Sequence, residues 1–306
     1  MNSMSSAPVA LFTYNRPWHT EHTVRSLLAN RLAPQTDLFV FSDAPKNDRS
    51  TDAVSEVRRY IRSIGGFRSV TVIERESNFG LAGSIVDGVT TLCRRFGRVI
   101  AVEDDLLVSP YFLDYVNDAL DAYEHDDRVV SVGCYVFPTQ HMLPETFFLQ
   151  IPDCWGWAVW ERSWRLYRSD GEGLLRDLAE RGLEKRFDFE GSHPYTEMLR
   201  AQIRGENDSW AVRWYASTLL AGGLTVYPGQ SMTRNIGFDG SGTHCGFGGA
   251  YEVGLIDRKI TLADIPVIES EIGRQAWREF FMRLRPRRRF QTQVLRARSW
   301  LRKMFA

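Results

Sequence analysis

The stretch Arg98-Val99-Ile100-Ala101-Val102-Glu103-Asp104-Asp105 decides how this chain is expected to fold, because a short apolar run ends there in three consecutive carboxylates. Val99 to Val102 has the length and β-branched content of a buried parallel strand, and open α/β sheets bind ligands at the carboxyl ends of such strands. Three adjacent acids repel one another unless water, a cation or hydrogen-bond donors offset their charge. A divalent metal that carries a phosphate is one explanation, and a solvated acidic turn is the other. The apolar residues Leu106 to Val108 that follow favour a site.

Strand and helix patterns alternate on both sides of this stretch. The alternation predicts a mostly parallel sheet with helices on both faces, which is a nucleotide-binding architecture, over residues 1–137. The expected strands are 8–14, 37–42, 69–75, 99–102 and 129–132, and the expected helices are 19–29, 51–63, the segment that begins after Asn78, and 110–123.

One further acid ends a strand of the same predicted sheet. Asp43 would reach the same edge as Glu103, Asp104 and Asp105, where its carboxylate could accept from a uracil or a ribose, or could cap a turn. Asn78, which precedes the next helix, is also expected on the nucleotide-sugar side. The glycines that follow it do not form G-x-G-x-x-G, and no Walker lysine is present, so a dinucleotide or P-loop site lacks support.

Aromatic residues become dense after residue 137, and the regular alternation stops, so 138–273 is read as a second, acceptor-side half. Trp155-Gly156-Trp157 places a glycine between two indoles. Sugar rings stack on aromatic planes and glycine permits close approach, but indoles also fill cores. Further on, Asp208 and Ser209 precede a predicted helix over 210–221. Asp208 is a candidate general base, and an N-cap explains the pair equally well.

Residues 229–249 contain seven glycines and are expected to form a long loop, a feature that is uncommon unless it is functional. Arg234 and His244 are its polar groups suited to a pyrophosphate. We therefore expect a lid that closes over a ligand.

The bulk composition is that of an ordinary globular protein, with 12% aromatic and 25% charged residues in 306. Four scattered cysteines indicate neither a zinc site nor a disulfide framework, and neither a signal peptide nor a membrane-spanning run is evident. Residues 274–306 carry eleven Arg and Lys against one acid, which leaves a net charge of −10 on residues 1–273. The tail pattern is that of a basic amphipathic helix, suited to an anionic membrane surface, to the acidic body or to a dimer; nucleic acid is disfavoured because the body is acidic.

Taken together, these motifs resemble those of nucleotide-sugar glycosyltransferases of the GT-A fold, particularly N-acetylglucosaminyltransferase I and its bacterial relatives. Val9 to Arg16 is similar to the opening strand and turn of that family, Ser42-Asp43 to its nucleobase-contacting aspartate, and Glu103-Asp104-Asp105 to its version of the D-x-D motif. Trp155-Gly156-Trp157 resembles a Gly-Trp near the acceptor, and 231–244 resembles the loop that orders over the donor. The likeness covers roughly residues 8–249.

The resemblance implies roles for individual residues. Asp105 would ligate a divalent metal, Mn²⁺ or Mg²⁺, that bridges the diphosphate, Asp104 would hold ribose or sugar hydroxyls, and Glu103 would contact the sugar. It also implies a base near the start of the 210–221 helix. The family has two acids there, whereas this chain has Asp208 followed by Ser209.

The expected function is an inverting, metal-dependent hexosyl or N-acetylhexosaminyl transfer from a nucleoside-diphosphate sugar, with UDP favoured. The acceptor would be a glycan or a lipid-linked saccharide, as in polysaccharide or lipopolysaccharide synthesis, at the cytoplasmic face of the plasma membrane. A sugar nucleotidyltransferase and a non-catalytic glycan-binding protein are the alternatives.

Overall fold

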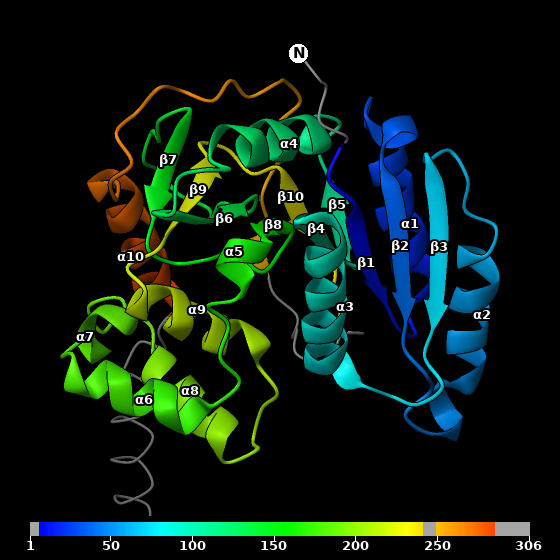
Figure 1. Cartoon of the computed structure of the whole chain (residues 1–306), viewed down its shortest axis with the longest axis horizontal. Helices are drawn as coiled ribbons and strands as arrows, with labels where there is room; N and C mark the ends of the chain where they lie inside the picture. The colour runs from blue at the N-terminus through cyan, green and yellow to red at the C-terminus, as the bar shows by residue number, and fades with distance from the viewer. Residues whose placement is uncertain (1–5, 241–248, 285–306) are drawn as a thin grey trace, which may run out of the picture.

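The computed structural model describes residues 6–240 and 249–284, and these form an α/β fold (Figure 1). The strands are β1 Val9–Thr13, β2 Asp37–Ser42, β3 Ser69–Glu74, β4 Arg98–Glu103, β5 Leu106–Val108, β6 Val129–Gly133, β7 Thr146–Leu149, β8 Trp157–Trp160, β9 Leu224–Pro228 and β10 Thr233–Asn235. The helices are α1 Pro17–Leu28, α2 Thr51–Ile61, α3 Gly80–Phe96, α4 Phe112–Ala122, α5 Glu161–Trp164, α6 Gly171–Glu180, α7 Glu184–Phe187, α8 Tyr195–Ile203, α9 Trp210–Leu220 and α10 Glu271–Leu284, with short 3₁₀ turns η1 Ala33–Gln35, η2 Asp48–Ser50 and η3 Gly249–Tyr251.

Eight strands form the main sheet, in the order β3-β2-β1-β4-β8-β6-β9-β7. The first four are parallel throughout, and β6 and β9 are also parallel, whereas β8 and β7 run antiparallel to their neighbours. Four of the seven neighbouring pairs are therefore parallel. The Rossmann-like α/β class expected from the sequence is confirmed, with antiparallel strands confined to the second half.

Alternating burial explains why helices cover both faces of the parallel half. Val9 and Leu11 of β1 face a core cluster shared with α1, α2 and α4, whereas Ala10 and Phe12 face one shared with α3 and α9. Successive side chains of a strand point to opposite faces, so a continuously apolar strand needs cover on both sides. In Figure 1, α3 lies on one face and α1 on the other.

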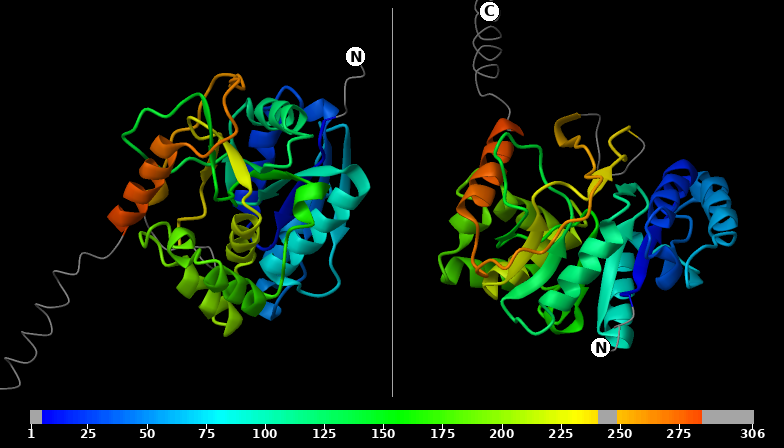
Figure 2. Two further views of the ribbon diagram at one scale, coloured as in Figure 1. Left: turned by 60° about the vertical axis from the view of Figure 1, so that its left-hand side comes forward. Right: turned by 90° about the horizontal axis from the view of Figure 1, so that it is seen from above.

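The second half closes around α10. Trp277, Phe280 and Phe281 of this helix are buried in a core cluster with Phe147 of β7 and Tyr215 of α9. Figure 2 shows α10 on the side of the molecule opposite β1 and β2. The beginning of the segment expected as a basic tail is thus part of the core, and residues 285–306, where the rest of that prediction falls, lie outside the described residues.

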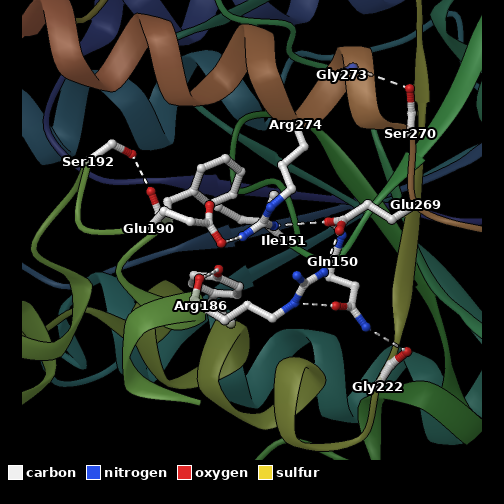
Figure 3. Close-up of polar contacts among 12 residues, drawn as sticks. Gln150, Ile151, Arg186, Glu190, Ser192, Gly222, Glu269, Ser270, Gly273 and Arg274 are labelled. Atoms are coloured by element: carbon white, nitrogen blue, oxygen red, sulfur yellow. Dashed lines mark hydrogen bonds and ion pairs between the residues drawn. The ribbon is translucent and has the colours of Figure 1, made fainter. Parts of the chain in front are cut away.

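A network of charged and polar side chains holds α10 against the rest of the chain (Figure 3). We call it the α10 clamp; its members are Gln150, Arg186, Glu190, Glu269 and Arg274. Arg274 donates to Glu190 at 2.5 Å and to Glu269 at 3.1 Å. Arg186 pairs with Glu269 and donates through Nε to Gln150 at 2.7 Å. Glu190 has a φ of 54°, a conformation uncommon for a residue with a side chain, so the clamp also holds a strained turn.

Two short strands depart from the sequence expectation. The prediction of a long loop over 229–249 was wrong for Thr233–Asn235, because these residues form β10, which pairs antiparallel with β5.

No helix among residues 6–240 and 249–284 has the length and apolar content needed to cross a bilayer.

Candidate active site

The carboxyl ends of β2, β1 and β4, three neighbouring parallel strands, bring the predicted acids to one edge of the sheet. Asp43 follows β2, Glu103 ends β4, and Asp104 and Asp105 come next. Tyr14 follows β1, between them, and its backbone N–H donates to Asp104 Oδ2 at 3.2 Å. This is the edge at which open parallel sheets bind ligands.

An arginine lies between the two aspartates. Arg16 precedes Pro17 at the start of α1, and its Nη2 pairs closely with Asp105 Oδ2 and lies 3.3 Å from Asp104 Oδ1. The Oγ1 of Thr23, about two turns further along α1, donates to the Asp104 carbonyl at 2.8 Å. We call Arg16, Asp104 and Asp105 the rim triad. Helix α1 therefore fixes both the backbone and the charges at the end of β4.

The charges of the rim triad are unbalanced. Burial raises the pKa of Asp104 to about 6, although Arg16 opposes the shift. Burial, together with the neighbouring Asp105 and Asp104, raises the pKa of Glu103 well above its usual range. Burial acts to lower the pKa of Arg16, but the two carboxylates outweigh it and raise that pKa. One guanidinium thus faces two aspartates with Glu103 next to them, and the raised pKa values of Asp104 and Glu103 indicate that further positive charge would be stabilised here.

A strap formed by residues 233–240 covers the triad. The backbone N–H of Ile236 donates to the Asp105 carbonyl at 2.8 Å. Gly237 lies directly against the carboxylate, since a Cβ at this position would be 2.2 Å from Asp105 Oδ2. Only glycine allows the strap to approach this closely. Part of the segment expected to form a lid is therefore described and contacts Asp105, and its closing over a ligand stays a prediction.

The buried polar atoms at this edge that have no hydrogen-bond partner among the described residues include Asp105 Oδ1, Arg16 Nη1 and Arg234 Nε. Buried polar groups are nearly always paired, so unpaired ones indicate a place for a ligand. A carboxylate oxygen suits a hard cation and the two arginine nitrogens suit an anion. The residues present thus fit a divalent cation at Asp105, with an anionic group beside it.

Asp43 and Asn78 join two turns at the same edge of the sheet. Both carboxylate oxygens of Asp43 accept backbone N–H groups, from Ala44 and Phe79 to Oδ1 at 2.9 and 2.8 Å and from Gly80 to Oδ2 at 2.9 Å. Asn78 Nδ2 donates to the Ala44 carbonyl at 2.7 Å. The capping role left open for Asp43 is what the structure shows, and its contact with a nucleotide stays a prediction.

Asp208 and Ser209 divide the roles that the sequence left open. Ser209 caps α9, because its side chain accepts from the Val212 N–H at 3.2 Å. Asp208 is exposed, and no described residue pairs with its carboxylate. A Cβ on Gly80 would lie 3.6 Å from Asp208 Oδ2, which places this acid beside the start of α3. Asp208 therefore has a free carboxylate near the turn that Asp43 holds.

The Trp155-Gly156-Trp157 motif splits between core and surface. Trp157 is 1% exposed and stacks on Trp210 with 5.1 Å between ring centroids, so a sugar cannot lie on its ring. Gly156 has a φ of 79° and lets the chain pass close to Thr233. Trp155 is half-buried and makes edge contacts with three other rings, those of Tyr135, Phe238 and Tyr251.

Sequence reasoning missed several residues that shape the site. Arg16 stood in a predicted turn without a role, and no local pattern links it to residues 88 positions away. Asp153 is buried, and its carboxylate accepts four backbone N–H groups, those of Cys134, Tyr135, Cys154 and Trp155. An acid directly before an aromatic run was its only signal. His244 lies outside the described residues.

The chain matches no protein-family model and no curated protein. Among solved structures it is similar to mannosyltransferase PcManGT from Pyrobaculum calidifontis in complex with GDP-Man and Mn²⁺, at 15% identity and a TM-score of 0.39, over 72% of this chain and 75% of that one. It is also similar to S. aureus TarS at 17% identity and a TM-score of 0.32, over 46% of this chain and 24% of that one. A structure assigned as a nucleotide-diphospho-sugar transferase from Desulfovibrio desulfuricans G20 aligns at 12% identity and a TM-score of 0.34, over 52% and 65% of the two chains. At these TM-scores the likenesses do not bear on the activity.

Proposed function

We propose that this protein is an inverting, metal-dependent glycosyltransferase that moves a sugar from a nucleoside-diphosphate sugar to a glycan or lipid-linked saccharide. The observation that carries the proposal is the buried, unpaired Oδ1 of Asp105 beside the unpaired Nη1 of Arg16, at the ligand-binding edge of a parallel sheet. A cation and an anionic group would satisfy both atoms together, and a metal-bound diphosphate supplies both.

Each acid at the edge receives a role that its position permits. Asp105 would hold Mn²⁺ or Mg²⁺; the described residues contain no group of three or more His, Cys, Asp or Glu arranged for a metal, so phosphate and water would complete the shell. The metal would stabilise the charge of the departing diphosphate. Asp104 and Glu103 would face ribose and sugar hydroxyls. Arg234, with its unpaired Nε, would face the diphosphate, as would His244.

The nucleoside side would be formed by the turns that Asp43 and Asn78 join, and we favour UDP as the nucleotide. Asp208 is the proposed general base, because its carboxylate is free to take a proton from an acceptor hydroxyl. A direct displacement of this kind inverts the anomeric centre. The strap would exclude water, which otherwise hydrolyses the donor.

The acceptor side would be lined by Trp155 rather than by Trp157, which is buried in the core. Membrane attachment would rest on residues 285–306. Ending the chain after Leu284 should therefore abolish co-sedimentation with anionic liposomes and leave donor hydrolysis intact. Ending it after Gly273 would remove Trp277 and Phe280 and unfold the second half. Equal sedimentation of the chain shortened after Leu284 would contradict membrane attachment through the tail.

The test of the function is binding and turnover in Asp105→Asn. Wild-type protein should gain thermal stability from a UDP-sugar only when Mn²⁺ is present, since a ligand of the folded state raises its stability by mass action. Asp105→Asn should lose this gain and at least a hundredfold in transfer rate. Asp257→Asn, at an exposed acid, is the matched control. Full activity of Asp105→Asn would overturn the metal site.

Two other outcomes would replace the proposal. Release of pyrophosphate from a nucleoside triphosphate and a sugar phosphate would identify a nucleotidyltransferase. Saccharide binding that is indifferent to both nucleotide and Mn²⁺ would identify a non-catalytic glycan-binding protein.

A further inference from the structure

We infer that Arg16 is a built-in counter-cation, which holds the acidic pair closed in the absence of a metal and must leave Asp105 when a divalent cation binds. The inference rests on the proposed function for the identity of the cation. It concerns how the charges of Asp104 and Asp105 are neutralised before a metal binds, which neither the fold nor the resemblance specifies.

The first step is the position of the guanidinium. A single nitrogen, Nη2, contacts a carboxylate oxygen of both Asp104 and Asp105. The positive charge of Arg16 thus lies against the same Asp105 carboxylate that would hold the metal. Arg16 therefore fills the place between two acids that would otherwise repel each other.

The second step is a count of the oxygens left for a metal. Asp104 Oδ2 accepts from the Tyr14 N–H, and Asp104 Oδ1 lies beside Arg16. Asp105 Oδ2 is taken by Arg16 and is covered by Gly237. Of these four aspartate oxygens only Asp105 Oδ1 remains, and a single carboxylate oxygen is a weak anchor for an ion that takes six or more ligands, even where phosphate and water complete its shell. A second carboxylate oxygen becomes free only when Arg16 moves.

The third step is the means of release. The side chain of Arg16 is 14% exposed, and its Nη1 already lacks a partner. An incoming phosphate beside the metal offers Nη1 an acceptor, so the loss of the carboxylate contact can be offset within the same site. Metal and phosphate would thus bind better together than either alone, because only the pair satisfies both the acids and the arginine.

The experiment measures the affinity of the full chain for Mn²⁺ alone, by titration calorimetry. Arg16→Gln keeps a polar side chain of similar length without the charge, and it should bind Mn²⁺ at least tenfold more tightly than wild type, because a competing cation is gone. Arg16→Lys should remain close to wild type. Arg31→Gln, which removes an exposed arginine paired with Asp114 at the other end of α1, is the control and should change nothing.

A second measurement uses the wild-type chain and does not depend on how the variants fold. In nitrogen NMR of arginine side chains, Mg²⁺ with UDP should shift the signal of one guanidinium, as its partner changes from a carboxylate to a phosphate, and this signal should be missing in Arg16→Lys. If wild type transfers sugar with Mn²⁺ but Arg16→Gln binds Mn²⁺ no more tightly than wild type does, the inference about Arg16 is wrong and the proposed function stands. Absence of Mn²⁺ binding to wild type even with UDP would overturn the metal site as well.

Discussion

The rim triad and the α10 clamp both consist of an arginine between carboxylates, but they differ in whether all their buried polar atoms have hydrogen-bond partners. Arg16 and Arg274 both have side chains that are 14% exposed, and each bridges two carboxylates. In the clamp, no buried polar atom lacks a partner among the described residues, whereas the triad leaves Asp105 Oδ1 and Arg16 Nη1 unpaired. A fully paired cluster adds shape and rigidity; a partly paired one is costly unless something else binds. The comparison separates a structural cluster from a site.

The largest effect on stability is expected from breaking the clamp. Arg274→Ala leaves Glu269 and Glu190 without their cation and should cost about 3 kcal/mol of the free energy of unfolding, measured with urea. Arg25→Ala, in an exposed pair with Glu21, should give no measurable change. Metal affinity of Arg274→Ala should equal that of wild type. A change in that affinity would mean that the two clusters are coupled.

An effect of about the same size, but dependent on pH, is expected from the rim triad. The pKa of Asp104 rises from 3.8 to about 6 on folding, so the folded state binds this proton more tightly than the unfolded state. The stability that this adds is fully present below pH 3.8 and is lost as the pH rises through about 6; at about 1.4 kcal/mol per pKa unit the loss is about 3 kcal/mol.

Asn at position 104 does not ionise, so the free energy of unfolding of Asp104→Asn should rise relative to that of wild type between pH 4 and pH 7. Free energies of unfolding for both proteins, measured across that range without metal, would check it. A difference that stays constant with pH would contradict the assignment.

The smallest effect is expected from the strap. In Gly237→Ala the new methyl group would press on Asp105 Oδ2, so the carboxylate or the strap must shift, at a cost of about 1–2 kcal/mol. Transfer activity should fall about tenfold or more, because Asp105 is displaced. Gly254→Ala, where a Cβ meets nothing within 4 Å, is the matched control. Wild-type activity in Gly237→Ala would show that the strap stands away from Asp105 during turnover.

The parallel half was predictable because its signals are local. Buried strands such as 37–42 are short apolar runs bounded by polar turns, and the structure has a strand with these limits. The acids at strand ends were predictable for the same reason, since parallel strands share one edge. Ser209 showed its capping role through its position before a helix.

The rest depends on partners distant in the sequence. β5 and β10 have three residues each, and Asn235 pairs with Leu106, which is distant in the sequence, so no periodicity reveals the pairing. Arg16 acquires its role only when β1 lies beside β4. Trp157 is a core residue because β8 is inserted between β4 and β6, whereas its neighbour Trp155 follows a loop and stays half-buried.

The burial of α10 in the second core has a consequence for how the protein is made. All four strands of the parallel half have been synthesised once residue 103 has emerged, so this half can begin to fold while the ribosome is still adding the second. The second core, by contrast, lacks Trp277 and Phe280 until residues beyond 270 are free of the ribosome. Its apolar surface therefore stays exposed during most of translation. A chain that ended early, before α10, would have a folded parallel half but an exposed second core, which would make it prone to aggregate.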